Sequence, residues 1–537
     1  MKRTSVYVLS LLMLSLAGCT DKFDEINTDP NQATEQQWDP NFFLPNAQNN
    51  YVNLGYDQML YQGPMLQVLA STFTYYGNGD KYVNTQNSTS YQGAIFNRTY
   101  STGTTLAEMI RLSKDKPQYA NLYQIGRILQ AMNVLRGTDT YGDIPYTQAF
   151  QAKAGTTAPK YDTQQSIYTA LLKEIDEATA ALDVNQAAPT GDMIYSRLSS
   201  STAKMTAWKK FGYSLMLRTA MRLIKVDAAT AKTYAEKAIA GGVFTSNDDN
   251  AYIQADANYA ASGIYNVYQV TDDYRELRFA KTFIDALKST SDPRLSAVAE
   301  VPQTGAANNA NKTLSGDNTA ASQLGLPNGY DLASGATDIR KSAGYPGPSP
   351  AANDKDSDAP LGKYSRPRIS VYLKKNGTMM VLSYAEVEFL LAEAKVRGWN
   401  VSGTAADHYK NGIVAAMTSL IQLDASAEIK AEAAQTWAAA HPLDVTSTDA
   451  SLKAINTQFW LATGTMFNFI EAWSNWRRTG YPVLTPINYP GNVTGSTIPR
   501  RMIYLSTEIS TNPTSYTEAV NRLSGGDLLT SRVWWDK

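Results

Sequence analysis

Apolar residues recur at intervals of three and four over much of the chain, which is the spacing of one face of an α-helix. Leu122, Ile125, Leu129 and Met132 are a clear example. The same pattern predicts further helices over residues 42–71, 167–182, 208–224, 228–240, 383–398, 404–420, 425–440, 451–461 and 466–476. Because these helices follow one another through short links, they predict tetratricopeptide-like helical pairs, although the full consensus of roughly 34 residues is absent.

The helical pattern stops between residues 243 and 382. Gly, Pro, Asn, Asp and Tyr dominate this stretch, and residues 341–360 are especially rich in Pro, Ser and Asp. One helix is expected from Tyr274 to Ser289, and residues 369–372 alternate as a small strand would. We therefore predict a loop-rich lobe with small strands, inserted into a helical scaffold. A second aperiodic stretch, residues 74–93, is rich in Tyr and Asn and is predicted to be a loop.

The N-terminus has the layout of an export signal. Lys2 and Arg3 precede an apolar run that ends at Leu16-Ala17-Gly18-Cys19. This run of roughly ten residues is too short to span a bilayer, which needs about 20 apolar residues. Its last residues resemble a bacterial lipobox, in which the cysteine is lipidated. Because Cys19 is the only cysteine, we expect a signal peptide at 1–18, a lipidated tether at 19–40 and no disulfides.

The composition excludes some partners and favours others. The formal net charge is −1, so no basic field invites nucleic acid. Tyrosine is overrepresented, with 33 Tyr against 14 Phe and 9 Trp. A tyrosine offers a flat apolar ring with a polar tip, which suits surfaces that bind polar, ring-shaped ligands or partner proteins. The alternative is that most of these side chains simply cap the core.

The sequence offers little for catalysis. His408 and His441 are its only histidines, and no nucleophile-elbow, metalloprotease or P-loop motif is present. Paired carboxylates could support glycoside hydrolysis, but spacing among 49 acidic residues identifies no pair. We therefore expect a protein that is not an enzyme.

One acidic stretch partly matches a calcium-binding loop. Asp354, Asp356 and Asp358 alternate like the start of an EF-hand loop. Ala359 and Ser365 stand where that loop needs Gly and Glu, which favours a solvated acidic loop. We expect no cofactor and no metal, with a loose calcium site as the alternative.

Several longer segments are specific enough to resemble a known family. They are YGDIPYTQAF (141–150), WKKFGYSLMLRTAMRL (208–223), SYAEVEFLLAEAKVRGW (383–399), IEAWSNWRRTGYP (470–482) and IPRRMIY (498–504). In this order they strongly resemble the SusD/RagB family, which are nutrient-binding lipoproteins of the Bacteroidetes outer membrane. Leu505 departs from the family pattern, where a proline is expected. The motifs themselves are interpreted as scaffold, with Arg477 and Arg478 near a helix C-terminus.

The resemblance implies a fold and a function. It implies a single SusD-like domain over residues 41–537, mostly α, with about four tetratricopeptide-like units on one side. The scaffold would comprise about 41–242 and 383–480, the loop-rich lobe about 243–382 and an irregular C-terminal segment 481–537. The implied function is a lipid-anchored outer-membrane protein, exposed on the cell surface, that binds glycans and delivers them to a SusC-like TonB-dependent transporter. A peptide ligand is the alternative, and a glycoside hydrolase is a further one.

We expect the ligand site on the tyrosine-rich loops rather than on the helices. A sugar ring has an apolar face that a flat aromatic can bury, while Asn and Asp side chains bind its hydroxyl rim. The candidates are Tyr75, Tyr76, Asn78, Asp80 and Tyr82 in the first loop, and Tyr265, Tyr268, Tyr274 and Tyr345 in the lobe.

Overall fold

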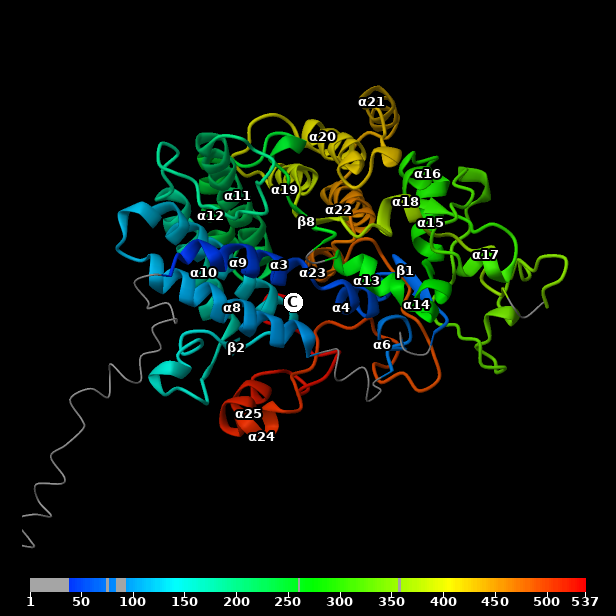
Figure 1. Ribbon diagram of the computed structural model, residues 1–537, viewed down its shortest axis with the longest axis horizontal. Coiled ribbons are helices and arrows are strands. Elements are labelled where there is room, and N and C mark those ends of the chain that lie inside the picture. The colour runs from blue at the N-terminus through cyan, green and yellow to red at the C-terminus, as the bar shows by residue number, and fades with distance from the viewer. Residues whose placement is uncertain (1–37, 74–76, 84–92, 259–260, 356–358) are drawn as a thin grey trace, which may run out of the picture. The chain divides into compact units, whose positions relative to one another are not determined.

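The computed structural model describes residues 38–73, 77–83, 93–258, 261–355 and 359–537. Residues 41–537 form one compact unit in which helices dominate and the described strands are two to five residues long (Figure 1). The predicted class, mostly α with tetratricopeptide-like helical pairs, is confirmed. Cys19 and the predicted signal peptide lie outside the described residues, as does nearly all of the predicted tether.

The first half of the unit is a series of long helices packed in chain order. They are α3 (Phe43–Val52), α8 (Ala94–Ser113), α9 (Ala120–Tyr141), α10 (Gln164–Ala180), α11 (Ser201–Met221) and α12 (Ala228–Gly241). Each packs on the next, from α3 on α8 to α11 on α12. Gly212 lets α10 and α11 approach closely, since a Cβ there would lie 2.1 Å from Thr179 Oγ1.

Polar caps explain where several of these helices begin. Thr163, Ser200 and Asp227 each accept a hydrogen bond from the backbone N–H three residues on, at the starts of α10, α11 and α12. Ser383 does the same for Glu386 N–H, 3.2 Å away, at the start of a later helix. That later helix lacks a reciprocal capping box, because the Glu386 carboxylate binds Arg218 instead.

Short elements connect α3 with α8. They are α4 (Gly55–Leu60), α5 (Gln62–Met65), β1 (Leu69–Ser71) and α6 (Gly77–Asp80). Gly55 is required where α4 crosses the lobe, because a Cβ there would lie 2.1 Å from the carbonyl oxygen of Gly263.

The loop-rich lobe contains small helices and two-stranded antiparallel sheets. Its elements are β4 (Ala251–Gln254), α13 (Gly263–Gln269), α14 (Thr271–Glu276), β5 (Leu277–Phe279), α15 (Lys281–Ser289), α16 (Arg294–Val298), β6 (Ala299–Glu300), α17 (Ala306–Ala310), β7 (Arg366–Pro367), α18 (Ile369–Tyr372) and β8 (Thr378–Leu382). The described sheets pair β1 with β5, β4 with β8, β6 with β7, and β2 (Ile144–Pro145) with β3 (Tyr161–Asp162).

Two predictions for this lobe are wrong. Residues 369–372 form the helical turn α18 and not a strand. The helix expected from Tyr274 to Ser289 is interrupted by β5, which pairs with β1. Short apolar segments satisfy either period, so tertiary pairing decides between them.

Helices resume after the lobe and complete the scaffold. They are α19 (Tyr384–Val396), α20 (Ala405–Thr418), α21 (Ala431–Ala440), α22 (Thr448–Thr465) and α23 (Phe469–Thr479), followed by the short α24 (Glu508–Thr511) and α25 (Pro513–Asn521). α19 packs on α11, α20 and α22, and α23 packs on α22 and α9, so the two helical stretches form one core. The end of the chain returns to this core, where Trp535 is fully buried.

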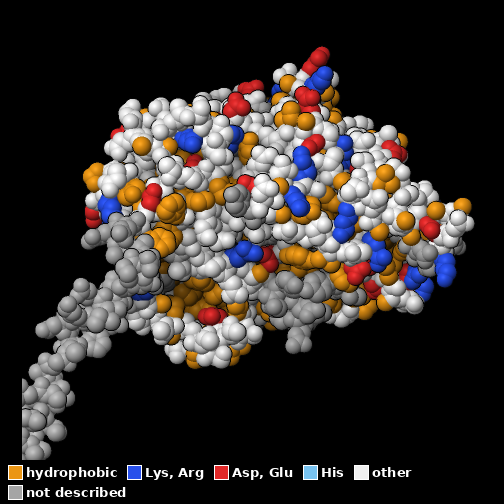
Figure 2. Space-filling view, viewed as in Figure 1, with side chains coloured by type: hydrophobic (Ala, Val, Ile, Leu, Met, Phe, Trp, Pro, Cys, Tyr) orange, Lys and Arg blue, Asp and Glu red, His pale blue; other side chains and the backbone are white. Residues whose placement is uncertain are grey.

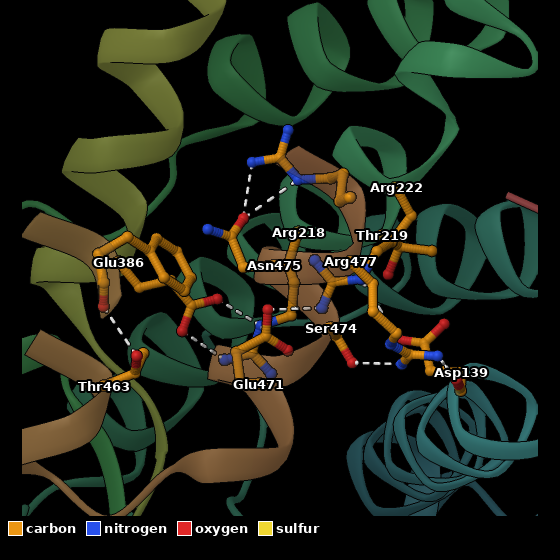
Figure 3. A network of polar contacts seen from close by, with 12 residues as sticks. Asp139, Arg218, Thr219, Arg222, Glu386, Thr463, Glu471, Ser474, Asn475 and Arg477 are labelled. Carbon is orange, nitrogen blue, oxygen red and sulfur yellow. Dashed lines mark hydrogen bonds and ion pairs between the residues drawn. The ribbon is translucent and has the colours of Figure 1, made fainter. Parts of the chain in front are cut away.

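A buried network of ion pairs joins these helices. Figure 3 shows arginines of α11 and α23 converging on acids of α9, α19 and α23. Arg218 donates to Glu386 at 2.5 and 2.7 Å, and Arg222 donates to Glu471 at 2.5 Å. Arg478 donates to both carboxylate oxygens of Glu393 at 2.6 Å. Buried charges are stable in a protein only with such pairing.

Candidate functional site

A surface pocket of about 470 Å³ lies between α4, the first turns of α8, and α13. It is lined by Asn53, Gly55, Tyr56, Asp57, Ala94, Asn97, Arg98, Gly263 and Asn266. On the face shown in Figure 2, basic and acidic side chains stand next to one another near the centre, with hydrophobic side chains beside them. This is the part of Figure 1 where α4, α13 and the start of α8 meet.

Local backbone packing positions these groups. The contact between Gly55 and Gly263 sets α4 directly against α13, so Asn53 before α4 and Asn266 on α13 line the same pocket. Asn97 lies one turn into α8, which begins immediately after Gly93. The pocket therefore adjoins the end of the tyrosine-rich stretch 74–93.

The amides of the pocket have free hydrogen-bonding capacity. Within the described part of the chain, the side chains of Asn53, Asn97 and Asn266 make no hydrogen bond. Asn97 and Asn266 are exposed, and Asn53 is half-buried. A side-chain amide offers two donors and one acceptor oxygen. Three such groups around one pocket suit a ligand whose surface carries many hydroxyl or amide groups.

The charged groups of the pocket are loosely held. Arg98 Nε lies 3.9 Å from Asp57 Oδ2, at the outer limit of an ion pair. Burial, the largest cause, raises the pKa of Asp57 to about 6, although Arg98 and Arg136 act to lower it. Tyr56, half-buried beside it, donates its hydroxyl to Asp273 Oδ2 at 2.5 Å. Asp57 is thus the carboxyl group of the pocket whose charge changes near neutral pH.

The first group of predicted site residues is not confirmed as a set of aromatic platforms. Tyr75 and Tyr76 lie outside the described residues, and Asn78 falls within α6 with its side chain also outside them. Asp80 and Tyr82 are fully buried, and Asp80 Oδ1 accepts from Lys81 Nζ at 2.8 Å. Neither side chain reaches solvent in this structure, so both are placed as packing groups.

The second group, in the lobe, consists of two buried and two half-buried tyrosines. Tyr268 and Tyr274 are 1% and 2% exposed, and the Tyr274 hydroxyl donates to the Asn311 carbonyl at 2.6 Å. Both are packing residues and cannot present a ring face to a ligand. Tyr265 and Tyr345 are half-buried, and Tyr345 donates to the Pro360 carbonyl at 3.1 Å. Of these four, Tyr265 is next in sequence to the pocket residue Asn266.

Sequence reasoning missed the pocket residues themselves. Asn53 lies just after α3, Asn97 on α8 and Asn266 on α13 of the lobe, far apart in the sequence. The available signal was the pair of glycines, Gly55 and Gly263, which interrupt the apolar pattern and mark a close backbone approach. A single glycine does not say which other segment it touches.

The residues weighed for catalysis and for calcium have structural contacts. His408 Nδ1 is 2.7 Å from Glu388 Oε2, and the His441 ring stacks on Trp437 at 3.9 Å. Asp354 accepts from the backbone N–H groups of Ala306 and Ala351, while Asp356 and Asp358 lie outside the described residues. Among the residues that are described, no cluster of three His, Cys, Asp or Glu side chains could hold a metal.

Comparison with known proteins defines the class. Residues 30–505 match the SusD-like family described as "Starch-binding associating with outer membrane". The chain therefore belongs to the SusD-like family, which is associated with the outer membrane. None of the described helices is long and apolar enough to cross a lipid bilayer.

Solved structures agree with this assignment. A chitin-binding protein is 28% identical with a TM-score of 0.75, and the match covers 93% of this chain and 100% of that one. A Bacteroidetes SusD-like protein, AC2a, is 25% identical, with the same TM-score and coverage. A chitin-binding SusD homologue from Flavobacterium johnsoniae is 24% identical with a TM-score of 0.71 over 93% of this chain and 98% of that one. No curated protein matches the chain.

Proposed function

We propose that this protein binds glycans at the cell surface and delivers them to a SusC-like TonB-dependent transporter. The observation that carries the proposal is membership of a family described as starch-binding and associated with the outer membrane. The 28% identical chitin-binding protein supports an oligosaccharide ligand. The sequence Leu16-Ala17-Gly18-Cys19 supports a lipid anchor.

The proposed glycan site is the pocket between α4, α8 and α13. Its three unpaired amides match the hydroxyl rim of a sugar, since each hydroxyl both donates and accepts. Tyr56 in the pocket and Tyr265 next to it supply aromatic rings of the kind that bury the apolar face of a sugar. Shallow, wet sites of this kind bind weakly, so we expect dissociation constants on the order of micromolar to millimolar.

Calorimetric titration of the mature, unlipidated protein with chito- and malto-oligosaccharides tests this site. In the double variant Asn97→Ala/Asn266→Ala we expect affinity to fall about tenfold or more, equivalent to about 1.4 kcal/mol or more, with the melting temperature nearly unchanged. The matched control is Asn185→Ala, an exposed asparagine between α10 and α11. Unchanged affinity in the double variant would place the glycan elsewhere.

Two further measurements on the same protein test the alternatives of peptide binding and glycan hydrolysis. A peptide panel in the same titration tests peptide binding, and a peptide that binds while every glycan fails would replace the glycan proposal. Incubation with a bound oligosaccharide tests hydrolysis. We expect no new reducing ends, and sustained turnover would make the protein an enzyme.

Anchoring and delivery require cellular experiments. We expect Cys19→Ala to leave the fold intact and to release the protein from the outer membrane, because Cys19 is the only cysteine available for acylation. Purification of the wild-type protein from its native membrane should recover a TonB-dependent transporter. A Cys19→Ala variant that is still labelled with palmitate, or a purification without transporter, would contradict these parts of the proposal.

A further inference from the structure

A second hollow lies next to the surface pocket. This cavity of about 70 Å³ is lined by residues of α3, α4, α9, α11, α13, β8 and α23. Its lining is apolar on one side, and its polar side includes Tyr51, Arg136, Asp139, Arg218, Glu471 and Ser474. Gly55 borders both the cavity and the surface pocket. A cavity of this size has room for a small ion, since a single water molecule needs about 10–15 Å³ of such space.

Arg136 is the group of this cavity whose charge is least compensated. It is only 7% exposed, its Nη1 donates to the Tyr51 carbonyl at 2.6 Å, and its guanidinium lies 3.8 Å from the centre of the Tyr51 ring. Nε and Nη2 have no hydrogen-bond partner in the described structure. Burial lowers the pKa of Arg136, which shows how poorly its charge is solvated. A buried, unpaired donor is strongly unfavourable.

The neighbouring acids are already bound to other groups. Asp139 accepts from Tyr168, Trp535 and Arg222. Glu471 Oε1 accepts from Arg222 Nη2 at 2.5 Å, and its Oε2 lies 3.6 Å from Arg218 Nε.

Two further acids near the cavity, Glu386 and Asp57, also have arginine partners. Glu386 forms a bidentate pair with Arg218. Asp57 pairs with Arg98 on the side of the surface pocket, 3.9 Å away. Both are thus directed at arginines other than Arg136.

Arg136 is the arginine of the cavity that lacks a carboxylate partner. Arg218, the other arginine that lines the cavity, pairs with Glu386 and Glu471. The side-chain hydrogen bond that the described structure gives Arg136 goes to a backbone carbonyl, that of Tyr51.

We propose that this cavity binds one small monovalent anion of the chloride class, held by Nε and Nη2 of Arg136. The anion supplies the missing negative charge and accepts from the two unpaired donors. The Ser474 hydroxyl, which lines the cavity and accepts from Arg477, has its own proton available for the same anion. A dianion such as sulfate would overcompensate the single charge of Arg136. The bound anion would link α3, α9 and α23 and so stabilise the scaffold behind the pocket.

Thermal unfolding of the mature protein tests the proposal. The protein is melted in sodium gluconate, which is replaced stepwise by sodium chloride or sodium bromide so that the total ionic strength stays constant. Binding to the folded state alone raises stability by mass action, so we expect about 1–2 °C per tenfold rise in chloride or bromide above the dissociation constant and none with gluconate. Equal melting temperatures in chloride and gluconate would overturn the proposal.

A variant and a crystal locate the anion. Arg136→Gln should lose the halide dependence, while Arg275→Gln, which alters an exposed arginine of α14 paired with Asp272, should keep it. Retained halide dependence in Arg136→Gln would overturn the proposed site. Because Arg136→Gln could fold poorly, the wild-type protein is also crystallised in bromide. An anomalous peak within hydrogen-bond distance of Arg136 is expected, and water alone at that position would overturn the proposal.

Discussion

The buried ion network and the surface pocket each contain a buried carboxyl group next to an arginine, but the pKa of the acid shifts in opposite directions. Glu393 in the network receives two 2.6 Å hydrogen bonds from Arg478. Asp57 in the pocket is 5% exposed, and its nearest recorded arginine nitrogen is 3.9 Å away. Burial acts to raise the pKa of both carboxyl groups. In Glu393 the arginines outweigh burial and lower the pKa to about 2, whereas in Asp57 burial prevails and raises it to about 6.

The difference teaches that partner geometry decides the charge of a buried acid in this protein. Bidentate contact compensates for lost hydration, and a pair at 3.9 Å does not. In the network, Glu386, Glu393 and Glu471 are each held by at least one arginine. In the pocket the charges and amides keep unused bonding capacity, which is what a ligand site needs.

Breaking the network should have the largest effect. Glu393→Gln leaves Arg478 buried without its carboxylate, so we expect the free energy of unfolding at pH 7 to fall by about 3–5 kcal/mol. Urea unfolding monitored by tryptophan fluorescence measures it. The control is Glu177→Gln, because Glu177 is an exposed partner of Arg127 and Lys173 and should matter far less. Equal losses in the two variants would show that pairing in the network is unimportant.

Two tyrosines on α13 sharpen the comparison within one helix. Tyr268 is buried, so Tyr268→Ala should lower stability by about 3–4 kcal/mol, as for other large core residues. Tyr265 is half-buried and precedes the pocket residue Asn266, so Tyr265→Ala should change stability little and weaken glycan binding. Parallel unfolding and calorimetry measure both. If Tyr265→Ala destabilises as much as Tyr268→Ala, it too is a packing residue.

The pocket acid predicts a pH dependence of stability. The pKa of Asp57 rises from its ordinary value of 3.8 to about 6, so between these values the folded protein binds the proton more tightly than the unfolded chain does. Its contribution therefore favours folding below pH 4 and is lost as the pH rises through 6, by up to about 3 kcal/mol.

The variant Asp57→Asn isolates this contribution. The amide does not ionise, so its stability relative to wild type should improve steadily from pH 4 to pH 7. Denaturant unfolding of both proteins across this range measures the change. Parallel stability curves would mean that Asp57 titrates normally.

The smallest expected effect is that of a reductant. The chain has one cysteine, so the mature protein has no intramolecular disulfide to reduce. Its melting temperature should be the same with and without dithiothreitol. A shift would reveal a disulfide between two copies.

Local sequence patterns predicted the helices correctly but not their long-range contacts. The apolar spacing of Leu122, Ile125, Leu129 and Met132 correctly predicted a helix, because helical periodicity is a local property. The helix predicted over residues 383–398 is also found, as α19 with Ser383 as its cap, for the same reason. The role of Glu386 could not be predicted, since its partner Arg218 lies 168 residues away in the sequence.

The tyrosines illustrate the same limit at the site. Tyr268 and Tyr265 are three positions apart, of the same residue type and in the same short helix, yet only Tyr268 is fully enclosed. Residue type suggested a sugar platform for both. Their exposure depends on what packs against each side of α13, and this is a property of distant segments.

By itself, the sequence determined the helical class, the loop-rich lobe, the family and the sole candidate for lipidation, because periodicity, composition and motifs are carried by neighbouring residues. The tertiary structure decided which tyrosines are buried, which arginine completes each ion pair, and that Gly55 meets Gly263 to form a pocket lined by asparagines. Contact between residues 200 positions apart depends on the packing of all the helices between them. Burial and pairing, and with them charge and binding capacity, follow only from that packing.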